Sequence, residues 1–149
     1  YASGDIIAPT AKYLTFDKIG RTTNSRGKIV NVTVQMDTAN ATNTSVKVRF
    51  FTVSDTTGLW AQLPADNAVF QSKFELGAGK YRWLGDVAVT LTIFGTTAGG
   101  ATSSEGTTTA AIPYELLDAE LRAVLLSTGA FEPKGSGVFR VILNVDRQN

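Results

Sequence analysis

The sequence contains neither cysteine nor histidine among its 149 residues. Without cysteine the chain can form no disulfide bond, no thiolate nucleophile and no thiolate metal site, so its fold has to be stabilised by packing alone. Without histidine it also lacks the side chain that most often titrates near neutral pH and most often binds transition metals. We therefore expect no catalytic activity and no cofactor or metal ion.

An excess of positive charge and a long apolar run are missing as well. The 14 Lys and Arg residues are balanced by 13 Asp and Glu, so a net charge of +1 predicts no direct contact with nucleic acid. No stretch approaches the ~20 apolar residues that a membrane span requires. The first residues, Tyr1 to Ile7, lack the basic start and apolar run of a signal peptide. We expect a protein that is made in a cytoplasm and has no membrane partner.

Alternation of apolar and polar residues is the dominant pattern, and it is typical of antiparallel β-strands. It is clearest between Gly27 and Asp37, where Val30, Val32, Val34 and Met36 are expected to face a core. Further strands are predicted at Val46–Phe51, Lys80–Leu84, Val87–Ile93, Leu121–Ser127 and Val138–Val145. The last two are expected to pair as a hairpin whose turn contains Gly135 and Gly137.

These strands predict an all-β fold, namely an antiparallel β-sandwich with a jelly-roll or related Greek-key topology. Residues 11–149 are expected to form one such domain, because 43% hydrophobic residues can fill one core. At most one short helix is expected, near Glu115–Ala119, since Pro113 and Glu115 favour a helix start. Gly95–Thr109 is almost wholly Gly, Ala, Ser and Thr, which predicts a loop or a polar crossover.

Three parts of the sequence carry a family resemblance: Tyr1–Ile7, Asp66–Phe70, and Leu121–Pro133 followed by Phe139–Val145. They resemble segments of bacteriophage head decoration (cement) proteins. The resemblance implies a non-enzymatic virion structural protein, made in the bacterial host cytoplasm, that lies on the outer capsid surface and stabilises the head. The implied partners are the major capsid protein and other copies of the chain, commonly in a trimer. The charged stretch Lys12–Lys28 and the Gly95–Thr109 segment depart from the family pattern.

The N-terminal segment is the first candidate contact region. Residues 1–10 are expected to form an arm, with Ile6, Ile7 and Pro9 as apolar anchors that reach the capsid or a neighbouring subunit. Such an arm could add a strand to the edge of another sheet. The alternative is that Ile6 and Ile7 pair within the sheet of their own chain.

Aromatic residues offer a second candidate contact. Trp60 lies in a predicted loop and Trp83 borders one, so both are candidates for an exposed aromatic contact. An exposed aromatic platform would favour an alternative function, a carbohydrate-binding module or a tail-fibre-type adhesin domain. A third interpretation is a hydrolase with an acidic pair drawn from Glu115, Asp118 and Glu120.

Overall fold

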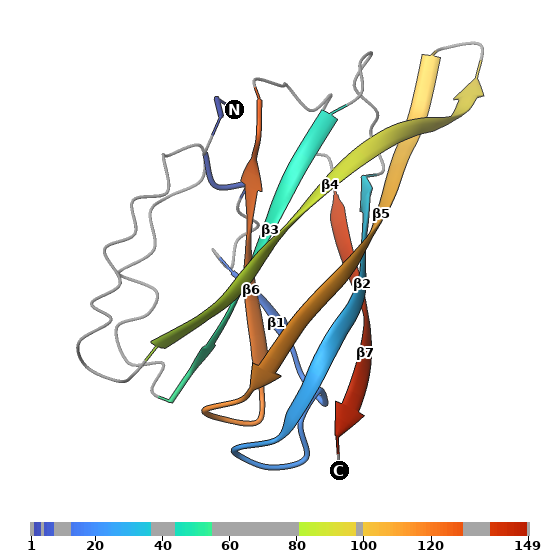
Figure 1. Cartoon of the computed structure of the whole chain (residues 1–149). Coiled ribbons are helices and arrows are strands. Elements are labelled where there is room, and N and C mark those ends of the chain that lie inside the picture. The colour runs from blue at the N-terminus through green and yellow to red at the C-terminus, as the bar shows by residue number, and fades with distance from the viewer. Residues whose placement is uncertain are drawn as a thin grey trace.

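In the computed structural model the described part of the chain consists of seven β-strands and contains no helix (Figure 1). The structure describes residues 2–3, 5–7, 13–36, 44–54, 81–97, 100–129 and 138–148, with 94–97 and 100–102 described by their backbone alone. The strands are β1 (Leu14–Phe16), β2 (Arg26–Met36), β3 (Thr44–Val53), β4 (Tyr81–Thr97), β5 (Gly100–Glu115), β6 (Leu121–Ser127) and β7 (Phe139–Gln148). Within these residues no helix could cross a membrane.

The seven strands form one curled antiparallel sheet in the order β1-β6-β3-β4-β5-β2-β7. Strand β4 belongs to both halves of this sheet, since it pairs with β3 over Tyr81–Leu91 and with β5 over Thr92–Thr97. The halves curve around a shared apolar core (Figure 1). The predicted all-β antiparallel fold is confirmed, and the two layers of the expected sandwich are the two halves of a single curled sheet.

A β-bulge in β2 changes which of its residues face the core. Val32, Val34 and Met36 are buried as predicted, but Ile29 is buried and Val30 is only half-buried. The register of β2 shifts between Ile29 and Asn31 against both neighbouring strands. Val30 is an extra residue relative to β7, whereas β5 has two residues opposite Val30. An extra residue reverses the alternation. The prediction for Val30 is therefore wrong.

A second bulge lies in the pairing of β3 with β4. Phe50 pairs with Gly85 and Phe51 with Trp83, so the register shifts between the two phenylalanines. Beyond it both faces of β3 are buried, because the outer face packs into a second apolar cluster. The members of that cluster are Ile6, Phe51, Val53, Tyr81, Val124 and Leu126. Only the first part of this strand has an outer face that is partly exposed.

The Gly95–Thr109 loop expected from the sequence is wrong, because most of it is β-strand: Thr97 ends β4 and Gly100 begins β5. Threonine is β-branched and suits a pleated strand, and Thr107 and Thr109 point from β5 to solvent. Low hydrophobicity here reflects a strand whose outer face is exposed.

The expected helical turn after Pro113 is also absent from the described residues. Pro113 lies within β5, and the chain bends at 117–119. The Leu116 amide donates to the Ser25 carbonyl at 3.0 Å, and the Leu117 amide donates to the Thr52 hydroxyl at 2.9 Å. The first amides of a helix have no hydrogen-bond partner within the helix. Here the Leu116 and Leu117 amides bond instead to residues distant in sequence, which holds the segment in a bent, non-helical conformation.

The predicted hairpin between the last two strands does not form. β6 lies between β1 and β3, whereas β7 pairs with β2 at the opposite end of the strand order. Every residue of β6 is buried, which requires cover on both faces. β7 alternates between half-buried and exposed residues, which is typical of a strand at the end of a sheet.

Candidate docking site

An arginine-lined cleft lies at the end of the sheet where β2 begins and β7 ends. This end of the sheet is at the bottom of Figure 1. The cleft has a volume of about 800 Å³ and is lined mainly by the loop between β1 and β2. Among the described residues its lining contains three cations, Arg21, Arg26 and Arg147, and no carboxylate. We call this feature the arginine cleft.

The loop that forms the cleft is held by specific backbone bonds. Lys18 and Asn24 adopt left-handed conformations with φ near 63° and 62°, and each lies in a turn of this loop. The Asn24 amide donates to the Leu116 carbonyl at 2.8 Å, which ties the loop to the β5–β6 connection. The Arg147 guanidinium donates to the Lys18 carbonyl at 2.6 Å. The cleft is therefore built from parts that are distant in sequence.

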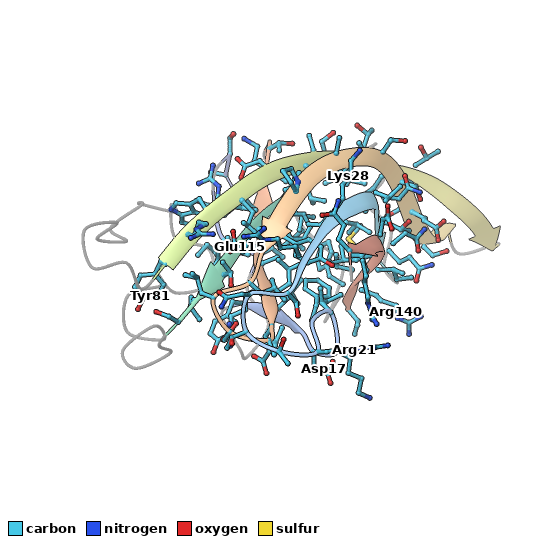
Figure 2. All side chains as sticks on the ribbon, turned by 60° about the horizontal axis from the view of Figure 1, so that its bottom comes forward. Asp17, Arg21, Lys28, Tyr81, Glu115 and Arg140 are labelled. Carbon is cyan, nitrogen blue, oxygen red and sulfur yellow. The ribbon has the colours of Figure 1, made fainter. Side chains whose placement is uncertain are left out.

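A second depression shares Arg26 with the cleft and adds Lys28, Arg82, Trp83 and Glu115. The Glu115 carboxylate forms ion pairs with two guanidinium groups, with N···O distances of 3.0 Å to Arg26 and 3.7 Å to Arg82. Figure 2 views the molecule with this end forward and labels Arg21, Lys28 and Glu115.

The two depressions together carry an excess of positive charge. Their lining holds five cationic side chains, Arg21, Arg26, Lys28, Arg82 and Arg147, against one carboxylate, Glu115. The whole chain has a net charge of only +1, so positive charge is concentrated at this end. Guanidinium groups bind carboxylates and phosphates through paired hydrogen bonds. The arrangement is suited to docking against an anionic surface.

Tyr114 contributes a polar group to the second depression. Its side chain is 4% exposed, and its hydroxyl has no hydrogen-bond partner in the described part of the chain. Burial raises the pKa of Tyr114 above its ordinary value of 10.0; Arg147 opposes this shift and Asp146 adds to it. The hydroxyl is therefore protonated at neutral pH and is a buried hydrogen-bond donor beneath the second depression.

We expect Tyr114→Phe to reduce the alkaline sensitivity of the fold. A pKa raised in the folded state means that stability is complete below pH 10 and is lost as pH rises through the folded-state pKa. The phenylalanine variant lacks this group and should lose less stability between about pH 8 and about pH 11. Urea unfolding at both pH values measures the difference, with Tyr13→Phe as the control. Equal losses in Tyr114→Phe and the unaltered protein would contradict the prediction.

No protein-family model matches this chain, and neither does any curated protein or any solved structure. The site is interpreted from its own geometry.

The structure places Ile6 and Ile7 within their own sheet, which was the alternative to an extended arm. Both side chains are buried, Ile6 forms a β-bridge with Leu126, and the Ile7 amide donates to the Leu125 carbonyl at 2.8 Å. As buried residues, Ile6 and Ile7 are not available as anchors on another subunit. Pro9 lies outside the described residues.

Trp83 is half-buried on β4, and Trp60 lies outside the described residues. The Trp83 ring packs edge-on against Phe51 with centroids 5.5 Å apart. The Arg49 guanidinium carbon lies over the Trp83 ring, 5.5 Å from the ring centroid. One ring face is thus covered within the chain, which disfavours a flat platform for a sugar. Trp83 instead borders the cationic end of the sheet.

The three carboxylates considered as an acidic pair belong to two separate groups of ion pairs. Arg122 is almost fully buried and bonds Asp118 at 2.7 Å and Glu120 at 2.5 Å. Glu115 instead pairs with Arg26. In the described residues, no cluster of three or more Asp and Glu could hold a metal ion.

Sequence reasoning missed the residues of the arginine cleft. A signal existed for two of them, because Arg21 and Arg26 lie in the charged stretch Lys12–Lys28 that departs from the decoration-protein pattern. No local signal identified Arg147, which joins them only through the pairing of β7 with β2.

Proposed function

We propose that this chain is a non-enzymatic virion structural protein that binds the outer surface of a bacteriophage capsid as an oligomer and stabilises the head. The observation that carries the proposal is the arginine cleft, which we propose as the surface that meets carboxylates of the major capsid protein. The sequence resemblance to decoration proteins supplies the class of partner. The cationic end of the sheet supplies the chemistry of the contact.

Weak, repeated contacts suit this role. An exposed ion pair contributes only about 0 to 1 kcal/mol, so a single cleft would bind a capsid weakly. An oligomer that presents several clefts to a symmetric lattice gains avidity by a factor of roughly 10² to 10⁴ without any new kind of contact. Binding of this kind should weaken as salt concentration rises, because exposed charges are screened.

We expect Arg21→Glu to weaken binding to capsids by about tenfold or more, because the change repeats in each subunit of the bound oligomer. Arg21 is exposed and lines the cleft, so the substitution should not disturb the core. Binding is measured by co-sedimentation of the purified protein with phage heads that lack their decoration protein, over a series of salt concentrations.

The matched control is Lys47→Glu, which makes the same charge change on the outer face of β3, away from the cleft. Its binding should stay within about twofold of the unaltered protein, as for other surface substitutions. Equal weakening by both variants would show a general charge effect and remove the cleft from the proposal. Absence of binding to any head, together with binding to glycans, would favour the carbohydrate-binding alternative.

A further inference from the structure

Strand β7 leaves apolar surface at the end of the sheet. Its inward residues Phe139, Val141, Leu143 and Val145 are only half-buried. Their partners in the adjacent strand β2 are Met36, Val34, Val32 and Ile29, and all four are buried. The rows of apolar side chains thus continue to the end strand, where part of their surface stays in contact with solvent. In the described part of the chain no strand pairs with the other side of β7.

The outward face of β7 carries one charge near each end. Arg140 and Asp146 are exposed, and neither forms an ion pair within the described residues. Arg140 has one long hydrogen bond, donated to Gln35 at 3.5 Å. The exposed Ile142 lies between the two charges and is 42% accessible.

We infer that β7 pairs with β7 of a second copy of this chain, antiparallel, across a two-fold axis at Leu143. In that register Arg140 of each copy lies opposite Asp146 of the other. The two-fold axis therefore produces two identical Arg–Asp ion pairs. On the inner face Val141 meets Val145, and Leu143 meets its own copy. Two copies of the strand in this register therefore place opposite charges together on the outer face and apolar side chains together on the inner face.

Neighbouring registers lack this complementarity. If one copy of β7 slides by two residues along the other in one direction, Asp146 lies opposite Ile142. If it slides by two residues in the other direction, Asp146 lies opposite Val138. In both cases the carboxylate faces an apolar residue. A shift by one residue would place the apolar face of one strand beside the polar face of the other. The charges therefore select one register, and they also oppose disordered pairing of an apolar edge with other strands.

The inference deepens the proposed function, because it names the partner that makes the oligomer, but its test needs no capsid. It predicts a dimer of twice 15.9 kDa in place of the trimer that the family resemblance implies. Light scattering over a dilution series measures the mass. A trimer, or a monomer at every concentration, would overturn the inference. Dimers that fail to bind heads would overturn the proposed function alone, and head binding by monomers would overturn the pairing alone.

Charge reversal tests the two ion pairs. Arg140→Asp and Asp146→Arg should each raise the dissociation constant of the dimer by about tenfold or more, since symmetry repeats each change. The double variant, with both substitutions, should restore it to within about threefold, because each pair regains opposite charges. Lys47→Asp, on the outer face of β3, is the control and should leave the constant unchanged. A double variant that stays as weak as the single variants would contradict the pairing.

A cysteine scan tests the register independently of affinity. The chain has no cysteine, so one introduced thiol can cross-link only to its own copy. Opposite residues of antiparallel strands have Cα atoms about 4.5 to 5.5 Å apart, which is within disulfide range. Leu143→Cys should therefore form a disulfide-linked dimer under mild oxidation, and Val141→Cys should not. The reverse result would overturn the register, and circular dichroism shows that each variant is folded.

Discussion

Phe50→Ala is expected to lower the free energy of unfolding by about 3 to 5 kcal/mol, the range for deleting a buried phenylalanine. Phe50 is fully buried on the inner face of β3, within the core shared by both halves of the sheet. Its cross-strand neighbours are Gly85 on β4 and Ala123 on β6. Because both neighbours are small, neither can fill the cavity, and the Phe16 ring, whose centroid lies 6.4 Å from that of Phe50, could fill only part of it by moving.

Urea unfolding followed by fluorescence measures this loss. A domain of this size has about 5 to 15 kcal/mol of stability in total, so the variant should lose a large fraction of it. Ile142→Ala is the control, because Ile142 is also a large apolar residue but lies half-exposed on the outer face of β7. It should change stability by about 0.5 kcal/mol or less in the monomer. A loss below about 1 kcal/mol for Phe50→Ala would show that the core repacks freely.

Gly106→Ala is expected to destabilise the fold by about 1 to 3 kcal/mol through a steric clash, the usual cost of overpacking. A Cβ atom at Gly106 would lie 2.0 Å from the Thr90 carbonyl oxygen and 2.9 Å from a methyl group of Val89. The carbonyl is backbone and cannot rotate away as a side chain could. The strands β4 and β5 would have to separate at this point, and the two halves of the sheet meet along that pair.

Gly129→Ala is the matched control for this substitution. A Cβ atom at Gly129 would meet nothing within 4 Å, and its backbone is not among those in a left-handed conformation. It should leave stability unchanged or raise it by about 0.4 to 1 kcal/mol, because alanine restricts the unfolded chain. Thermal unfolding of both variants decides the matter: similar melting temperatures would contradict the clash.

The strands that the sequence predicts best are those with one apolar and one polar face. Alternation identified β2, the first part of β3 and the Val87–Ile93 part of β4, because each has an inner face in the core and a more exposed outer face. Strand β7 was predicted from its β-branched and aromatic residues. Alternation failed where a bulge inserted one residue, as at Val30, since a bulge depends on the partner strands. It also failed for β5, whose small and polar residues are strand-forming only between β4 and β2.

The candidate site was less predictable because it depends on which strands become neighbours. The sequence indicated an unusual charged stretch around Arg21 and Arg26, but no property of that stretch pointed to Arg147. The expected hairpin of the last two strands did not include the pairing of β7 with β2. Only the pairing of β7 with β2 brings the three guanidinium groups to one cleft.

The strand order also sets how this chain must fold. Only β4 and β5 are joined by a short connection and paired with each other, so this hairpin can form early and locally. Strand β2 can complete its pairing only after β5 and β7 have been synthesised, and β7 is the last strand of the described chain to leave the ribosome. Non-local pairing of this kind slows folding to milliseconds or seconds, and until β7 arrives one edge of β2 stays exposed. A chain truncated before β7 should therefore aggregate during synthesis.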